Sequence, residues 1–201
     1  YMHHRFLHPQ ELQKVLSPIN SVFLAAPSLV EYLPFSLITA VSSTLDNRLT
    51  NPQPGDDEEI ESTFIYAANF CQIAKCSQEE LDYFINVCFK YLQKLLVMNK
   101  KSEFYDKFYS LLTTSTTDEF PTNILNLIQV IDNNSFGLIC CAAKIKGEIL
   151  FNNYQNLVEM TLKFVENEHN SVNISFLQCF MTAIFKDSEI TSKYLEVAIQ
   201  S

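Results

Sequence analysis

Apolar residues recur three and four positions apart along the chain from about residue 57 onward. This spacing places them on one face of an α-helix and predicts a run of amphipathic helices of about 12 to 20 residues each. Eight helices fit this part of the chain. Their apolar faces lie in residues 60–71, 81–95, 104–112, 124–131, 138–149, 154–165 and 176–184, and a last short helix is expected from about residue 188.

Local start and stop signals fit this pattern. Ser77 is followed three residues later by Glu80, which is the spacing of a capping box, so a helix is expected to begin here. Pro121 suits the first turn of a helix, where its missing N–H is no loss. The short breaks between helices contain Asn133, Asn153 and Asn170 as turn or cap residues.

The N-terminal quarter is less regular, because proline disfavours helical backbone in the residue before it. Three or four short helices are expected there, and a loop is expected over residues 47–57, which contain Pro52, Pro54 and Gly55. We expect the proline-broken part, residues 1–50, and the helical-hairpin region, residues 51–201, to form one continuous domain. The prolines that interrupt the first part are Pro9, Pro18, Pro27 and Pro34.

The predicted fold class is all-α. The chain has only three glycines, which disfavours both β architectures and phosphate-binding loops. Consecutive antiparallel helices taken in pairs give a unit of about 35 to 40 residues, the period of helical-hairpin repeats. A hairpin cannot cover its own apolar face, so neighbouring hairpins stack on it. A compact helical bundle shows the same periodicity and is the alternative architecture.

The hairpin length, the faces rich in Leu, Ile and Phe, and the Asn or Asp residues in the turns resemble the HEAT/armadillo class of α-solenoids. The resemblance spans about residues 57 to 200. It implies a scaffold or adaptor that presents a groove to a protein partner, and it carries over no functional residue.

The net charge is -9, and the successive stretches 1–50, 51–100, 101–150 and 151–201 carry 0, -4, -2 and -3. A protein that binds nucleic acid or an anionic membrane surface needs a stripe of Lys and Arg side chains on its own surface. None of the four stretches is net basic, so neither is expected as a direct ligand.

A membrane span is not expected, because every apolar stretch is interrupted before the roughly 18 residues that a transmembrane helix needs. The first residues lack the pattern of a signal peptide. Six cysteines lie at apolar helical positions, where a reduced thiol packs as a small hydrophobic group. An intracellular, reducing compartment, cytoplasmic or nuclear, is therefore expected.

Metal and catalytic sites are not expected either. His3, His4 and His8 lie near the first residue with no interleaved acid, and no pair of Cys-x-x-Cys motifs provides a zinc site. His169 is the only histidine elsewhere, and nothing places it beside a thiol as a general base. The sequence thus predicts no enzyme activity, cofactor or metal, and an enzyme with an unrecognised helical site is the alternative.

The sharpest charge feature is an acidic run at the predicted start of a helix, where negative charge interacts favourably with the helix dipole. Two interpretations remain open for it, helix stabilisation and contact with a basic segment of a partner. The residues of this run are Asp56, Asp57, Glu58, Glu59 and Glu61.

Four tyrosines on two consecutive predicted helices are expected opposite the apolar stripe. Aromatic side chains dominate the energetics of protein interfaces, so these four are candidates for an exposed binding patch. Packing between helices is the alternative. The four are Tyr83, Tyr91, Tyr105 and Tyr109.

The sequence predicts a protein-interaction scaffold or adaptor that binds a protein partner through a helical surface or groove. The alternative is a helical regulatory domain that acts on a GTPase or kinase as an exchange or activating factor. The oligomeric state is left open.

Overall fold

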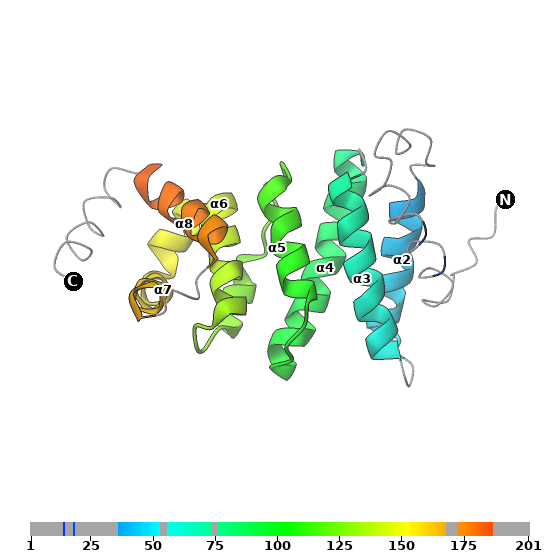
Figure 1. Cartoon of the computed structure of the whole chain (residues 1–201), viewed down its shortest axis with the longest axis horizontal. Coiled ribbons are helices and arrows are strands. Elements are labelled where there is room, and N and C mark those ends of the chain that lie inside the picture. Colours follow the sequence, from blue (N-terminus) through cyan, green and yellow to red (C-terminus); the bar gives the residue numbers. More distant parts are fainter. Residues whose placement is uncertain are drawn as a thin grey trace. The chain divides into compact units, whose positions relative to one another are not determined.

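The computed structural model describes residues 14, 18, 36–52, 56–73, 76–167 and 173–186. Within these ranges the chain forms α-helices and one 3-10 helix, and no strand (Figure 1). The prediction of an all-α protein is therefore confirmed. None of the helices in the described ranges is both long enough and apolar enough to cross a membrane.

The helices lie close to their predicted positions. The eighth helix, expected from about residue 188, and most of the proline-broken N-terminal part lie outside the described residues. The described helices are α2 (Ser36–Thr50), α3 (Asp56–Ile73), α4 (Gln78–Met98), α5 (Phe104–Thr114), η2 (Thr122–Leu127), α6 (Asn133–Asn153), α7 (Gln155–Asn167) and α8 (Ile174–Lys186).

Helix α4 begins as predicted. Ser77 is its N-cap, and its side chain accepts a hydrogen bond from the Glu80 backbone N–H while the Glu80 carboxylate accepts one from the Ser77 N–H. The helix ends at Asn99, which adopts the left-handed conformation with φ 49° and ψ 40°. This conformation lets the Asn99 N–H reach the carbonyls of Leu95 and Leu96.

The helix predicted around residues 124–131 is a shorter 3-10 helix, η2, so the expected α-helix is wrong here. Pro121 is its N-cap residue and does not lie in the first turn. The chain leaves η2 at Ile128 with extended backbone and reaches a capping box at Asp132 and Ser135, where α6 begins. The Ile124 N–H donates to the Pro121 carbonyl and the Ile128 N–H donates to the Leu125 carbonyl, and these i to i+3 hydrogen bonds are those of a 3-10 helix.

Contacts divide the chain into two compact units, the first ending at Ser115 and the second beginning at Thr116. The boundary does not coincide with the 47–57 loop. The division into residues 1–50 and 51–201 within one continuous domain stays a prediction.

In the first unit, the closest packing joins alternate helices, α2 with α4 and α3 with α5. Thr39 and Asp46 on α2 bond to Glu80 and Lys90 on α4, and because the order is the same on both helices, α2 and α4 run parallel. Figure 1 shows these helices in a row from α2 to α5.

Aromatic rings fill the core of the first unit. The Phe64 ring on α3 stacks on the Tyr91 ring of α4 at a centroid distance of 4.5 Å, and the Phe104 ring of α5 meets Phe64 edge-on at 5.4 Å. Phe104 also stacks on Phe108 at 5.3 Å. One ring cluster therefore joins three successive helices, and it is built from side chains that are almost fully buried.

In the second unit, α6 packs most closely against α8 and also contacts α7 and η2. Helix α6 is kinked at Lys146, whose φ of -132° and ψ of 44° are not helical. A Cβ at the next residue, Gly147, would contact the Phe151 ring one turn later on α6 and Ala183 on α8. At the end of α6, the Tyr154 hydroxyl donates a 3.0 Å hydrogen bond to the Thr122 carbonyl, which ties α6 to η2.

Candidate protein-binding surface

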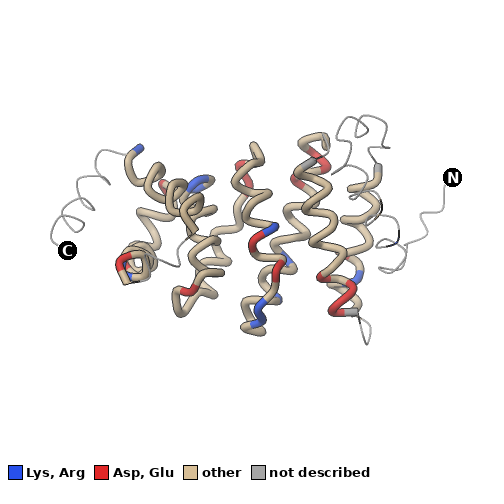
Figure 2. Tube along the Cα trace, in the orientation of Figure 1, with Lys and Arg blue, Asp and Glu red and all other residues tan. Residues whose placement is uncertain are grey.

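The acidic run begins at the first residue of α3, as the sequence predicts. Figure 2 shows these acidic residues gathered at that end of the helix. The Asp57 carboxylate accepts a 3.1 Å hydrogen bond from Lys94 of α4, while its side chain remains 62% exposed. The Glu58 side chain is also exposed, and nothing is described for the Asp56 side chain.

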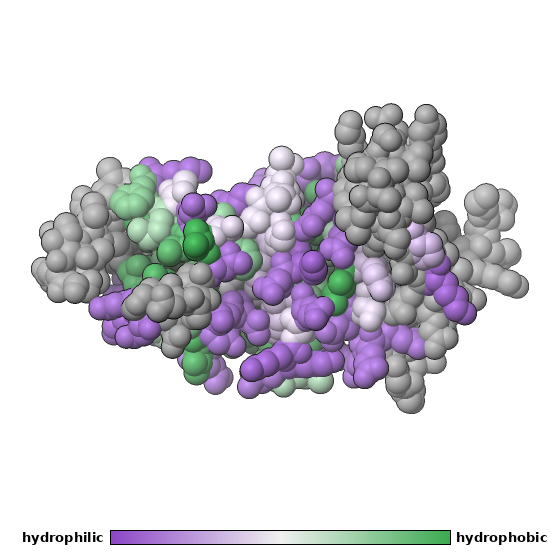
Figure 3. Space-filling model, viewed as in Figure 1, coloured by the Kyte–Doolittle hydropathy of each residue, from purple (hydrophilic) through white to green (hydrophobic). Residues whose placement is uncertain are grey.

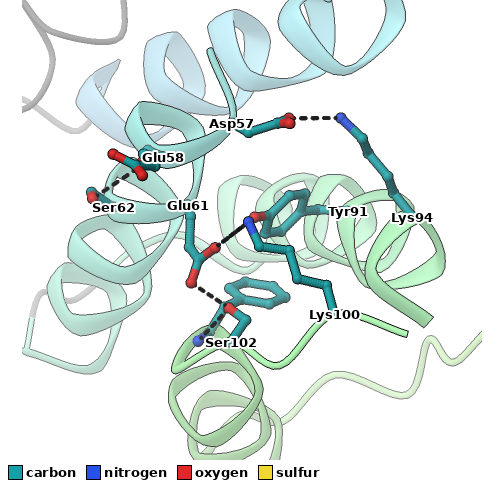
Figure 4. Close-up of polar contacts among 9 residues, drawn as sticks. Asp57, Glu58, Glu61, Ser62, Tyr91, Lys94, Lys100 and Ser102 are labelled. Atoms are coloured by element: carbon teal, nitrogen blue, oxygen red, sulfur yellow. Dashed lines mark hydrogen bonds and ion pairs between the residues drawn. The ribbon is translucent and has the colours of Figure 1, made fainter. Parts of the chain in front are cut away.

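Glu61 has a different environment from the rest of the run, because groups from α4 and from the α4–α5 connection converge on its carboxylate (Figure 4). The Ser102 hydroxyl donates to it at 2.7 Å, the Tyr91 hydroxyl at 3.4 Å and the Lys100 ammonium at 3.1 Å. The Ser102 hydroxyl in turn accepts a hydrogen bond from the Phe104 N–H at the start of α5. Glu61 therefore connects α3 to α4 and to the segment that leads into α5.

Tyr91 takes part in this network from inside the ring cluster. Burial raises the pKa of its hydroxyl well above the usual value, and the negative charges of Glu61 and Asp57 raise it further. The hydroxyl thus stays protonated and donates to Glu61.

The four tyrosines do not form an exposed patch. Tyr83 is 37% exposed, whereas Tyr91, Tyr105 and Tyr109 are 3%, 2% and 1% exposed. The predicted exposure of these three is wrong. Neighbouring helices cover a wider part of the surface of α4 and α5 than the Leu and Phe positions alone indicate. Tyr91 packs between Phe64 and Phe104. Tyr109 packs against Phe108 and Tyr105.

Tyr83 lines a surface hollow of about 510 Å³ near the start of α4. Thr39 of α2 lines one side of this hollow, and its hydroxyl donates a 3.3 Å hydrogen bond to the Glu80 carboxylate. Ser77 and the exposed Glu79 complete the lining. This hollow combines a partly exposed aromatic ring with carboxylates, which suits an organic cation.

Tyr83 and the acidic run are separate places on the first unit. Asp57 bonds to Lys94, and Tyr83 lies three turns earlier on α4, about 16 Å away along the helix axis. The structure therefore brings together Asp57 and Glu58, places Tyr83 elsewhere, and uses Glu61 within the unit. Glu59, which is half-buried, accepts a hydrogen bond at its backbone carbonyl from Thr63.

A second hollow, of about 690 Å³, lies between α6 and α8 in the second unit. Small residues such as Ala143, Gly147 and Ala183 form part of its lining, and Lys144 and Lys186 are also at its edge. Hydrophobic residues are visible over α8 in Figure 3, and Phe185 at the end of this helix is 52% exposed. Sequence reasoning missed this hollow, for which the only local signal was Gly147 within an apolar helix.

The cysteines of both units are free thiols. Cys88, Cys140 and Cys141 are buried, and burial raises the pKa of each. Among the described residues, no group of three or more His, Cys, Asp or Glu side chains is arranged to hold a metal ion. His3, His4, His8 and His169 lie outside the described residues.

Comparison of the chain with protein-family models, with curated proteins and with solved structures finds no match.

Proposed function

We propose that the chain is a protein-interaction scaffold whose helical hairpins stack as in an α-solenoid. The observation that carries the proposal is the packing of alternate helices, α2 with α4, α3 with α5 and α6 with α8. In a stack of hairpins, the first helices of successive hairpins lie side by side, and so do the second helices. Each such layer exposes a row of helix surfaces on which a partner can bind.

The partner proposed here is a protein with a basic segment. Asp57 and Glu58 are exposed at the start of α3, and Glu79 is exposed beside Tyr83 on α4. The whole chain carries a net charge of -9, so its field attracts a basic segment and raises the rate of encounter. Tyr83 supplies an aromatic face against which a Lys or Arg side chain can pack.

The test compares capture of proteins from a cell lysate by three immobilised forms of the chain. The first is the unchanged chain, and the second carries Asp57→Asn, Glu58→Gln and Tyr83→Ala. The third carries Asp118→Asn and Glu159→Gln, which change two exposed acids of the second unit and alter the net charge by the same amount.

We expect the second form to capture at least tenfold less of a partner that the first and third forms capture equally well. We expect added salt to release this partner from the first and third forms. Equal capture by all three forms would mean that Asp57, Glu58 and Tyr83 do not contribute to binding the partner. Failure of the unchanged chain to capture any protein reproducibly would contradict the scaffold function itself. A captured GTPase whose nucleotide exchange is accelerated by the chain would instead favour the regulatory alternative.

A further inference from the structure

Two hydroxyl residues of the chain are followed by acidic residues at both the second and the third position. Kinases select substrates partly by charge pattern, and acids placed just after a hydroxyl suit a kinase with a basic substrate site. By sequence the two positions are equivalent, but the fold gives them different surroundings. They are Ser77, followed by Glu79 and Glu80, and Thr116, followed by Asp118 and Glu119.

Ser77 is held in the cap of α4. Its hydroxyl accepts a 3.3 Å hydrogen bond from the Glu80 N–H and donates a 2.9 Å hydrogen bond to the Glu80 carboxylate. The residues after it, from Gln78 onward, are helical. A kinase has to bring the acceptor hydroxyl to its own catalytic carboxylate, so phosphorylation of Ser77 requires the cap of α4 to open.

Thr116 lies outside any helix. Residues 116–121, between α5 and η2, have no regular secondary structure. Thr116, Asp118 and Glu119 are all exposed, and all three belong to the second unit. The acceptor and the two carboxylates that follow it are therefore accessible without the opening of a helix.

Buried neighbours anchor this segment. Thr117 is buried, and its hydroxyl accepts a 3.3 Å hydrogen bond from the Glu119 N–H. Phe120 is buried as well. The segment is thus held at these two residues, while the side chains of Thr116, Asp118 and Glu119 remain on the surface.

The hydroxyl groups just before Thr116 are less accessible acceptors. Thr113 and Thr114 lie in the last turn of α5, and each donates to a carbonyl of the preceding turn. Ser115 is half-buried, and its hydroxyl donates to the carbonyl three residues earlier at 3.1 Å. Thr116 is the residue of this stretch that combines exposure, non-helical backbone and acids at both following positions.

We propose that Thr116 is a phosphorylation site for an acid-directed protein kinase, with MgATP as the phosphate donor. The Thr116 Oγ1 atom attacks the γ-phosphorus of ATP, the bond from this phosphorus to the β–γ bridging oxygen breaks, and ADP leaves with that oxygen. The hydroxyl proton passes to the catalytic carboxylate of the kinase. The product adds a charge of about -1.5 to -2 beside Asp118 and Glu119.

The test uses the whole folded chain, a purified kinase of the casein kinase 2 type and MgATP. Trypsin places Ser77 in peptide 76–90 and Thr116 in peptide 108–144, and tandem mass spectrometry then locates the phosphate. We expect phosphate on Thr116, at a rate at least tenfold higher than on Ser77.

Synthetic peptides 70–87 and 109–126 carry the same two sequences without the fold. The first peptide is expected to be phosphorylated at least as fast as the second, because its serine is no longer held in a helix cap. This reversal relative to the folded chain would show that the fold selects Thr116.

Two variants test the residues of the site. Thr116→Ala, at an exposed position, is expected to leave peptide 108–144 without phosphate. The double variant Asp118→Asn with Glu119→Gln is expected to slow phosphorylation of Thr116 at least tenfold, because the charge pattern that the kinase recognises is gone.

The matched control for the double variant is Glu148→Gln with Glu159→Gln. It neutralises two exposed acids on helices of the same unit and changes the net charge equally. We expect it to be phosphorylated at the rate of the unchanged chain.

Four results would overturn the proposal. One is a folded chain that takes up no phosphate in peptide 108–144, and another is a phosphate that remains there in Thr116→Ala. The third is phosphorylation of Ser77 in the folded chain as fast as that of Thr116. The fourth is equal slowing by the two double variants, because the acids after the acceptor would then have no specific role.

Discussion

Ser77 is a single side chain whose removal should be measurable. It accepts a hydrogen bond from the Glu80 N–H at the start of α4. Ser77→Ala should lower the free energy of unfolding by about 1 kcal/mol, because one backbone donor of the first turn loses its partner. Urea unfolding followed by circular dichroism measures this difference.

Ser62→Ala is the matched control for this change. The Ser62 hydroxyl donates to the Glu58 carbonyl inside α3, so its removal leaves no backbone donor unpaired. We expect a change within about 0.5 kcal/mol. Equal losses for the two variants would contradict the importance of the cap.

The buried ionisable groups predict how stability depends on alkaline pH. Burial raises the pKa of Cys88, Cys141 and Tyr91 in the folded chain, whereas in the unfolded chain cysteine titrates near about 8.5 and tyrosine near about 10. As pH rises past these values, the unfolded chain loses protons that the folded chain keeps. The free energy of unfolding should therefore fall as pH rises above about 8.5.

Tyr91→Phe isolates one of these groups. The ring remains between Phe64 and Phe104, but the hydroxyl that would ionise in the unfolded chain is gone. Urea unfolding at pH 7, 9 and 10.5 should show a shallower decline for this variant between the last two values. An identical decline would mean that Tyr91 ionises equally in both states.

At the scale of the helices, the contacts of Glu61 decide how α3 is held to its neighbours. Its side chain is 20% exposed and accepts hydrogen bonds from α4 and from the α4–α5 connection. Glu61→Ala should lower the free energy of unfolding by about 1 to 2 kcal/mol. This is the loss expected for hydrogen bonds to a charged carboxylate, reduced because the Glu61 side chain is partly exposed to solvent. Thermal or urea unfolding tests this value.

Glu58→Ala removes an exposed carboxylate one turn earlier on the same helix and serves as the control. Its effect should be within about 0.5 kcal/mol, because no buried group depends on that carboxylate. If both variants lost the same stability, the effect would come from charge at the start of α3 and not from the Glu61 network.

At the scale of the whole molecule, the division at Ser115 predicts two units that open separately. Phe104 is completely buried in the ring cluster of the first unit, so Phe104→Ala should cost about 3 to 5 kcal/mol there. Amide hydrogen exchange should accelerate in α3, α4 and α5 and remain unchanged in α6 and α8.

Phe136→Ala provides the reverse experiment. Phe136 is 1% exposed and packs against Phe164 in the second unit. Exchange should accelerate in α6 and α7 and stay unchanged in α3 and α4. Faster exchange throughout the chain in either variant would show that the two units unfold together.

Local sequence signals predicted the helices well. The three-and-four spacing located α3, α4 and α5, and Ser77 with Glu80 located the start of α4, because both signals act within one or two helical turns. The same spacing failed at η2, where the apolar residues 124 and 125 are buried but only six residues separate Pro121 from Ile128. Apolar spacing does not distinguish a 3-10 turn from a short α-helix.

The sequence by itself determined the helical class, the capping of α4 and the position of the acidic run at the start of α3. The tertiary structure decided that Tyr83 is exposed while Tyr91, Tyr105 and Tyr109 are buried, and that Glu61 bonds to Lys100 and Ser102. The physical reason is range. Helix formation depends on neighbours within four residues, whereas burial and side-chain pairing depend on which other helices cover each face.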